Sequence, residues 1–346
     1  MTTAVAALQR VRSSSLVDAL GLLLLGTVIV FLVFKFFEDP TRFLNVGIIG
    51  VTNGAIYGLV ALGYTLVYGI LQLINFAHGD VFALSGLVAS TIILSVLGLE
   101  EGTSVIFVVL GLLATLAVTI PLFALINAGI ERVAYKPLRH APRLAALITA
   151  VGMSFIVQNV ALALYGVDFE SVPNFIPRTA AIDIGGVVIP WNKLAVFMIV
   201  IPVLLAMTWF VRSTRQGKGM RAVAQDTEAA AMMGINVNRT ISVTFFLAGS
   251  LAAVAGLVYL LQFNMRYDTG FELGLIAFTA AVLGGIGNLT GAVLGAMLIG
   301  CVQAFNEGLD GTPGGDWTRS IVFGILIAVL VFRPQGILGE RTPEGA

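Results

Sequence analysis

Charged residues are so sparse in this chain that they divide it into long uncharged stretches. The longer stretches without Asp, Glu, Lys or Arg are 19–34, 43–79, 81–99, 102–130, 144–167, 194–211, 240–265, 273–306 and 320–332. A helix that spans a bilayer needs about 20 mostly apolar residues. Most of these stretches suit one span each. The spacing therefore predicts an all-α polytopic membrane protein with about ten transmembrane helices.

The composition excludes the main soluble classes. Hydrophobic residues make up 58% of the 346 residues and charged residues only 11%, against about 25% in a typical soluble domain. A soluble enzyme or a disordered chain could not accommodate so much apolar surface. Acidic and basic residues are equal in number, at 19 each, so net charge indicates no nucleic-acid partner. The single cysteine, Cys301, excludes a disulfide within the chain.

Two stretches, 43–79 and 273–306, are too long for one helix and slightly short for two. Each contains three glycines spaced by four residues: Gly50, Gly54 and Gly58 in the first, and Gly287, Gly291 and Gly295 in the second. This spacing puts small residues on one helix face, where another backbone can approach closely. The run from Gly285 to Asn288 predicts a helix break. We therefore expect two Gly-rich broken segments.

In transporters, a pair of Gly-interrupted segments in the two halves points to the translocation path. Plain helix packing needs the same glycines and remains the alternative. The candidate path residues are Asn53, Gly54, Tyr57, Gly58, Asn75, His78, Asn288 and Gly291.

The run Gln72–Asp80 is the most polar part of the first long segment. Asn75, His78 and Asp80 should face protein or water, because unpaired polar groups are costly in lipid. They could form a gate or proton relay, or a cap between two helices. We favour the cap, because an acidic group at a helix start can accept free amide protons. No basic partner is close in the sequence.

Basic residues orient the chain. We interpret 19–34 as a retained first helix, since no cleavage site follows it. With a cytoplasmic N-terminus and two crossings by 273–306, ten spans result and both termini are cytoplasmic. Thirteen basic residues are then inside: Arg10, Arg12, Arg132, Lys136, Arg139, Arg143, Arg212, Arg215, Lys218, Arg221, Arg239, Arg333 and Arg341. Six are outside, with the acidic loop Glu307–Asp316: Lys35, Arg42, Arg178, Lys193, Arg266 and Arg319. This asymmetry obeys the positive-inside rule.

The segment Arg212–Arg239 is the longest polar loop on the predicted cytoplasmic side. Its apolar positions recur at helical spacing and would form one face: Met220, Val223, Ala224, Thr227 and Ala231. Gly234 sits where a glycine commonly ends a helix. We expect one short surface helix that docks onto another subunit.

Several motifs resemble a known transporter family. Glu228-Ala229-Ala230, followed by Gly234, resembles the coupling loop of ABC-importer permeases. The stretches 50–70, 75–80 and 284–295 are similar to the first permease subunit of high-affinity branched-chain amino acid importers. The resemblance covers residues 43–335. Residues 1–42 are predicted to be an N-terminal extension with the first helix, and residues 336–346 a cytoplasmic tail.

The resemblance implies a location in the inner membrane of a prokaryote and a set of partners. These are a second homologous permease, two ATP-binding subunits and an extracytoplasmic solute-binding protein. The apolar face of the loop helix would enter a groove on an ATP-binding subunit. The coupling residues are then Met220, Val223, Ala224, Thr227, Glu228, Ala229, Ala231 and Gly234. The chain has no phosphate-binding loop, so ATP would be hydrolysed by a partner, and no cofactor is expected here.

The leading hypothesis is thus a permease subunit that moves branched-chain or similar apolar amino acids. A permease for urea or short amides shares much of the pattern. An ion-coupled secondary transporter is less favoured, because His78 and Asp80 are its only candidate coupling groups. An intramembrane enzyme is disfavoured, because the two histidines, His78 and His140, form no metal or catalytic pattern.

Overall fold

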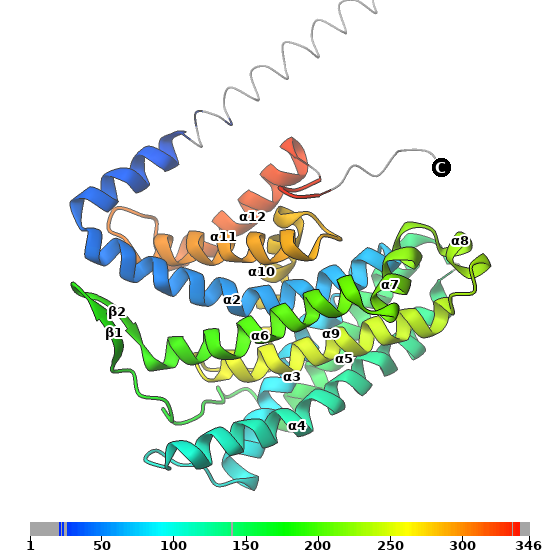
Figure 1. The fold of residues 1–346 in the computed structure, drawn as a ribbon, viewed down its shortest axis with the longest axis horizontal. Coiled ribbons are helices and arrows are strands. Elements are labelled where there is room, and N and C mark those ends of the chain that lie inside the picture. Colours follow the sequence, from blue (N-terminus) through cyan, green and yellow to red (C-terminus); the bar gives the residue numbers. More distant parts are fainter. Residues whose placement is uncertain (1–20, 22, 24–25, 140, 334, 340–346) are drawn as a thin grey trace, which may run out of the picture.

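The computed structural model is described for every residue except 1–20, 22, 24–25, 140, 334 and 340–346. It is mainly helical (Figure 1), which confirms the predicted fold class. Residues 26–38 are helical and lead into the elements named by chain order. These are α2 (Pro40–Leu71), α3 (Ala77–Thr91), η1 (Ile92–Val96), α4 (Val105–Ile130), η2 (Glu131–Tyr135), η3 (Lys136–Leu138), α5 (Arg143–Tyr165), β1 (Ala180–Ile184), β2 (Val187–Pro190), α6 (Trp191–Ser213), α7 (Arg215–Gln225), α8 (Thr227–Met232), α9 (Val237–Leu260), α10 (Thr269–Gly284), α11 (Leu289–Gly308) and α12 (Gly315–Phe332). In the described residues, eight helices are long and apolar enough to span a bilayer, and α10 is a shorter apolar helix.

Both long uncharged segments break, but at different kinds of sequence. The second breaks where predicted, because Gly285 and Gly287 have φ values of 105° and 96° that favour glycine. In the first, α2 continues through its three spaced glycines for 32 residues. It ends only where Gln72 takes a left-handed conformation, with φ 52°. The polar run, rather than the glycines, therefore interrupts this segment.

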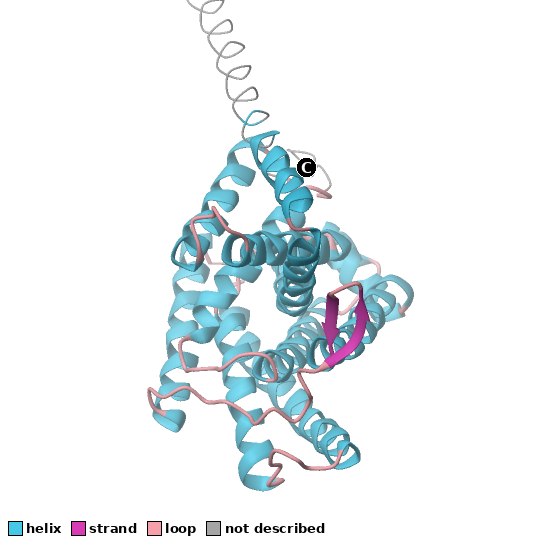
Figure 2. Cartoon of the chain, turned by 90° about the vertical axis from the view of Figure 1, so that its left-hand side faces the viewer, coloured by secondary structure: helices cyan, strands magenta, loops and turns pink. Residues whose placement is uncertain are grey.

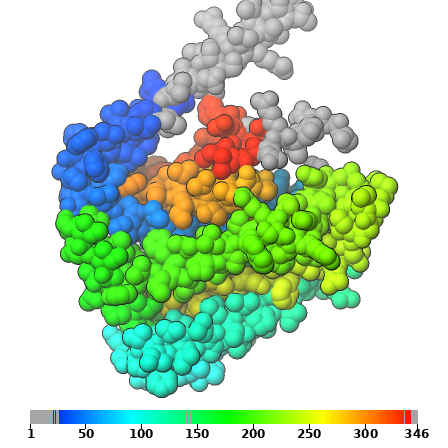
Figure 3. All heavy atoms as spheres, in the orientation of Figure 1, coloured from blue at the N-terminus to red at the C-terminus, as the bar shows by residue number. Residues whose placement is uncertain are grey.

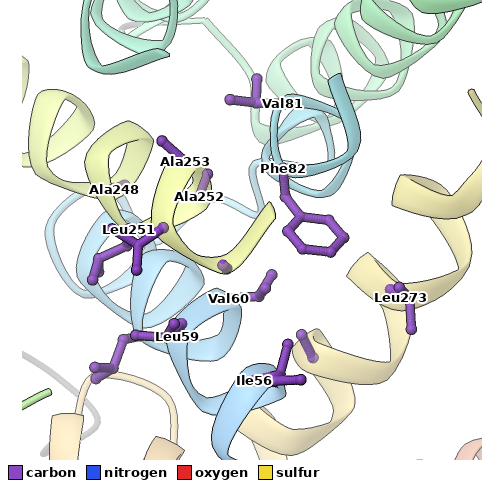
Figure 4. Packing of buried hydrophobic residues seen from close by; sticks show 14 of the residues in the cluster. Ile56, Leu59, Val60, Val81, Phe82, Ala248, Leu251, Ala252, Ala253 and Leu273 are labelled. Atoms are coloured by element: carbon purple, nitrogen blue, oxygen red, sulfur yellow. The ribbon is translucent and has the colours of Figure 1, made fainter. Parts of the chain in front are cut away.

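The central helices are α2, α3 and α9. Their most apolar windows are 78%, 67% and 72% buried, whereas those of α5, α6 and α12 are 22%, 22% and 11% buried. Figure 4 shows the packing, with Val60 of α2 between α9, near Ala252, and the Phe82 ring of α3. The peripheral helices expose apolar side chains, as expected where lipid covers a protein surface.

Long-range hydrogen bonds place the helix ends at two opposite ends of the bundle. At one end, Arg212 in the last turn of α6 donates to Thr290 of α11 at 2.9 Å, and Arg139 donates to Asn238 of α9 at 2.5 Å. At the other end, Arg42 of α2 donates to the Gly308 carbonyl at 3.1 Å. The number of crossings remains a prediction, because much of the predicted first span lies outside the described residues.

The end that holds Arg42 also carries ion pairs. Arg42 contacts Asp310, and this guanidinium lowers the pKa of the Asp310 carboxyl. Arg319 of α12 donates to Glu272 of α10 at 2.5 Å. Two of the predicted outside cations, Arg42 and Arg319, therefore pair with acidic residues from other parts of the chain. Which end faces the cytoplasm remains a prediction, and Arg10, Arg12 and Arg341 lie outside the described residues.

A β-hairpin interrupts the helical fold before α6. β1 and β2 pair antiparallel, with Ile184 opposite Val187, and Gly185 and Gly186 form the turn with φ values of 63° and 88°. Two successive positive φ values are typical of a hairpin turn. The hairpin appears in magenta in Figure 2, and Asn45 of α2 anchors it by donating to the Gly186 carbonyl at 3.0 Å. The sequence pattern did not predict this element.

The first residues of the predicted C-terminal tail belong to the helical domain. The Ile337 and Leu338 amides donate to the Leu283 and Gly284 carbonyls at 2.8 and 3.0 Å. In the other direction, Asn288 Nδ2 donates to the Leu338 carbonyl at 2.8 Å. Residues 337–338 thus fasten the α10–α11 turn.

Candidate functional site

The polar loop between α6 and α9 forms two helices rather than the single helix expected. Asp226 has an extended conformation, with φ −153° and ψ 111°, and separates α7 from α8. Its Oδ1 accepts from the Glu228 and Ala229 amides, both at 2.9 Å. An aspartate side chain that caps the next helix competes with a continuous helical backbone. The predicted apolar face is therefore divided in two.

The α7 half of that face is covered by this chain. Met220 is 3% exposed and Val223 is 2% exposed. Gly217 lies so close to the Val211 carbonyl that a side chain there would clash. Arg221 donates to the carbonyls of Val211 and, at 3.0 Å, Arg212. The expectation that Met220 and Val223 enter a partner's groove is therefore wrong.

The α8 half projects outward at the edge of the molecule (Figure 1). Met232 and Met233 are 82% and 83% exposed, and Ala231 is exposed beside them. The two methionines were not predicted as coupling residues, because they fall outside the 3–4 residue repeat. Two adjacent large apolar residues directly before a helix-ending glycine were the sequence feature that could have indicated an exposed apolar surface here. Two exposed thioether side chains on a protruding helix form a surface suited to an adaptable apolar contact.

Gly234 ends α8 as expected. Its φ is +82°, and its amide donates to the Ala231 carbonyl at 3.0 Å. The Ile235 amide closes the turn on the Ala230 carbonyl at 3.1 Å. Among the other predicted coupling residues, Thr227 and Glu228 are exposed, whereas Ala224 and Ala229 are half-buried.

The polar run after α2 supplies a buried cluster. Asn75, His78 and Asp80 are all 1% exposed or less. Asn75 Oδ1 accepts from the Tyr135 hydroxyl at 2.8 Å, and Asp80 Oδ2 accepts from the Ser154 hydroxyl. The run thus connects the start of α3 with η2 and α5.

Asp80 does not act as the predicted cap. The start of α3 has no side-chain capping bond, although Asp80 lies in its first turn. The His78 ring packs edge-on against Tyr64, with ring centroids 4.9 Å apart, and fills the space beside Gly63. Burial between helices, rather than capping, is what these polar residues share.

The spaced glycines permit two very close helix contacts. A Cβ on Gly50 would lie 2.7 Å from the Cα of Cys301, and one on Gly54 would lie 2.6 Å from the Cα of Met297. Gly291 of α11 similarly faces the Gly284 carbonyl of α10. The predicted close approach of backbones is confirmed for these glycines.

The eight candidate path residues fall into three places. Asn53, Gly54, Tyr57 and Gly58 lie on α2, where Asn53 and Tyr57 are 6% and 4% exposed. Tyr57 donates to Gln303 Oε1 of α11 at 2.6 Å. Asn75 and His78 belong to the buried cluster. Asn288 and Gly291 lie at the α10–α11 turn, where Asn288 caps α11 by accepting from the Gly291 amide at 3.0 Å.

Comparisons with known proteins match this architecture to one family. The family model described as "Branched-chain amino acid transport system / permease component" matches residues 48–331. The high-affinity branched-chain amino acid transport system permease protein BraD of Pseudomonas aeruginosa is 38% identical over 301 residues, covering 85% of this chain and 95% of BraD. The corresponding LivH protein of Escherichia coli (strain K12) is 36% identical over 300 residues, with the same two coverages.

Two other known proteins are similar to this chain at lower sequence identity. The autoinducer 2 import system permease protein LsrC of Photorhabdus luminescens is 27% identical over 201 residues, covering 55% of this chain and 57% of LsrC. A solved structure, PsaBC from Streptococcus pneumoniae in complex with Fab, covers 89% of this chain and 97% of its own at 15% identity, with a TM-score of 0.42. With the family model matching most of the chain and relatives above 30% identity, this protein belongs to the permease-component family of branched-chain amino acid transport systems.

Proposed function

We propose that this chain is a transmembrane permease subunit of an ABC importer for branched-chain or similar apolar amino acids. The family match over residues 48–331 is the observation that carries the proposal. ATP would be hydrolysed on two partner subunits, and a solute-binding protein would deliver the amino acid. A second, homologous permease in the same prokaryotic inner membrane would complete the path.

The α8 tip is the proposed contact with an ATP-binding subunit. Met232 and Met233 offer two exposed apolar anchors, and Ala231 beside them permits close approach. Docking of a short helix into a groove takes most of its energy from such anchors. Glu228 lies on the exposed first turn of α8, where it could meet a basic partner residue.

Motion of α8 could reach the membrane through α7. The Gly217 contact and the Arg221 bonds hold α7 firmly against the end of α6. Arg212, at that same end, bonds Thr290 of α11. Closure of the ATP-binding subunits would then move α6 and α11 together, as rigid-body alternating access requires.

The path is proposed to run beside α2 and α3. Asn53, Tyr57, Asn75 and His78 would supply its polar groups after the helices move. Gly54, Gly291 and Asn288 would act by positioning helices, since the two glycines lie in close packing and Asn288 caps α11. Gly58 would present a small side to the path, because a Cβ there would have only Ala296 within 4 Å among the described residues. Apart from His78, none of these residues carries a group that ionises near neutral pH, which suits a solute without net charge.

Transport assays in proteoliposomes test the proposal. The chain would be reconstituted with its second permease, ATP-binding subunits and binding protein, and uptake of labelled leucine, urea and acetamide compared. ATP-dependent leucine uptake is the expected result. Uptake of urea or amide without leucine would support the alternative permease class, and uptake driven by an ion gradient without ATP would contradict ABC import.

A further inference from the structure

A basic cavity lies where α7 and α9 begin. Its volume is about 460 Å³, and its lining includes Arg215, Lys218 and Arg239 but no acidic residue. In the described part of the chain, none of these three cations has a carboxylate within 4.0 Å. Three cations around one cavity without a counter-charge favour an anionic ligand.

Backbone and amide groups add to this preference. Thr214 caps α7 and Asn236 caps α9, so two helix N-termini meet at the cavity. The N-terminal end of a helix carries partial positive charge and favours phosphate or carboxylate groups. Gln216 also lines the cavity, and its Nε2 is buried without a hydrogen-bond partner among the described residues.

An apolar groove of about 340 Å³ lies further along the same two segments. It is lined by residues 203–210 of α6 and 247–254 of α9, together with Ile120 of α4. In Figure 3 the green α6–α7 segment lies along the yellow α9. Ser250 is the single polar residue in this lining, and it satisfies its own hydroxyl by donating to the Phe246 carbonyl at 2.9 Å. The groove therefore suits a hydrocarbon chain.

The cavity and the groove share one face of α9. Asn236 and Thr240 line the cavity, and Leu247, Ser250 and Val254 line the groove. These positions are separated by four, seven, three and four residues, spacings that keep them on a single helical face. Thr240 and Leu247 are seven residues apart, or about 10 Å along the helix. The polar layer of each leaflet is about 5–7 Å deep, so a headgroup in the cavity can extend its chain into the groove.

We propose that the α6–α9 groove binds one anionic phospholipid, with its phosphate in the basic cavity and an acyl chain in the apolar groove. The apolar groove on the same face of α9 distinguishes a lipid from free phosphate. It also disfavours an acidic side chain of a partner protein as the occupant, because such a side chain would leave the groove empty. Basic pockets between transmembrane helices are a recognised type of site for acidic lipid headgroups.

Thermal unfolding of the purified, delipidated full-length protein measures this binding. The probes are dioleoyl phosphatidylglycerol, dioleoyl phosphatidylcholine and inorganic phosphate. Phosphatidylglycerol should raise the midpoint temperature in a saturable way, and the other two should not reproduce the shift. Arg215→Gln/Arg239→Gln should weaken the apparent affinity about 25-fold, given about fivefold per basic residue near an acidic lipid.

Two further variants control for general effects. Arg132→Gln/Lys136→Gln removes two exposed cations that do not line the cavity, so it should keep the wild-type affinity. Ala206→Trp fills the apolar groove and should weaken phosphatidylglycerol binding while all cavity cations remain.

Four outcomes would overturn the assignment. If phosphatidylcholine raised the midpoint temperature equally, the cavity would not select an anionic headgroup. If Arg215→Gln/Arg239→Gln kept the wild-type affinity, the cations of the cavity would not bind the headgroup. If inorganic phosphate alone raised the midpoint temperature as much as phosphatidylglycerol does, the basic cavity would be a site for free anions. Loss of phosphatidylglycerol binding once ATP-binding subunits are assembled would assign the cavity to an acidic residue of that partner.

Discussion

Gly54 of α2 lies directly against Met297 of α11, at a distance that leaves no room for a side chain. A Cβ on Gly54 would lie 2.6 Å from the Met297 Cα and 2.8 Å from the Ala296 carbonyl oxygen. Both neighbours are backbone atoms, so rotamer changes cannot relieve the contact. The packing of α2 on α11 therefore depends on this glycine.

Gly54→Leu should separate α2 from α11. Overpacking in a filled core costs about 1–3 kcal/mol, and the backbone contact puts this site at the upper end. We expect a lower midpoint of thermal unfolding and loss of uptake. Gly129→Leu in α4 is the matched control, because no atom lies within 4 Å of its added Cβ. Equal stability of the two variants would refute the proposed dependence on Gly54.

Gly234→Val should uncouple ATP hydrolysis from transport. No atom lies within 4 Å of a Cβ at Gly234, so the only penalty is its φ of +82°. That conformation costs an L-residue about 1–2 kcal/mol and is disfavoured most in β-branched residues. Gly234→Asn should retain coupling, since asparagine tolerates left-handed conformations. Binding-protein-stimulated ATPase activity and uptake, measured together, would separate the two variants. If the Val variant matched the Asn variant, the end of α8 would not control coupling.

Met232→Ser/Met233→Ser should weaken assembly with the ATP-binding subunit. Both side chains are more than 80% exposed, so the chain itself should fold normally. Loss of two apolar anchors should cost about 30-fold in affinity, because an interface hot spot contributes about 2 kcal/mol or more. Co-purification of the ATP-binding subunit measures this loss. Val133→Ser, at another position 75% exposed, is the control and should assemble fully.

Ser154→Ala should destabilise the protein through Asp80. The change removes the hydroxyl that Asp80 Oδ2 accepts from, which leaves a buried acceptor unpaired at a cost of about 1–3 kcal/mol. In an Asp80→Asn background the same change should cost less, because a neutral amide is cheaper to leave unpaired. A double-mutant cycle on thermal stability measures the difference. If the two costs were equal, the bond would not contribute to stability.

Topology can be tested by labelling. In a Cys301→Ala background, Asp310→Cys should react with an impermeant thiol reagent added outside intact cells, and Glu228→Cys should not. Both positions are exposed, and they lie at opposite ends of the bundle. Reaction at Glu228→Cys with protection at Asp310→Cys would invert the predicted orientation.

Much of the fold could be predicted from charge spacing, because the bilayer makes charge costly wherever a helix crosses it. The break at 285–288 was also predictable, since the glycines there adopt conformations that other residues avoid. Gly234 was predictable for the same reason. These features depend on the residue type at each position, which can be read directly from the sequence.

The parts that could not be predicted depend on neighbours. Helical periodicity showed that Met220 and Val223 share a face, but not that this chain covers that face itself. The loop helix breaks at Asp226, because the side chain of Asp226 caps the next helix. The helical spacing of apolar residues in the sequence continues across Asp226 and gives no sign of this break. Ser154, which donates to Asp80, lies 74 residues away from it in the sequence. No local signal identifies such a pair.

Residues 337 and 338 give the α10–α11 hairpin a late step in its biogenesis. The carbonyls of Leu283 and Gly284 receive their bonds from these amides, and the Nδ2 group of Asn288 donates to Leu338. A nascent chain that has already inserted α10 and α11 still lacks these partners until synthesis passes residue 338. The α10–α11 turn can therefore be fastened only after the segment that follows α12 has been synthesised.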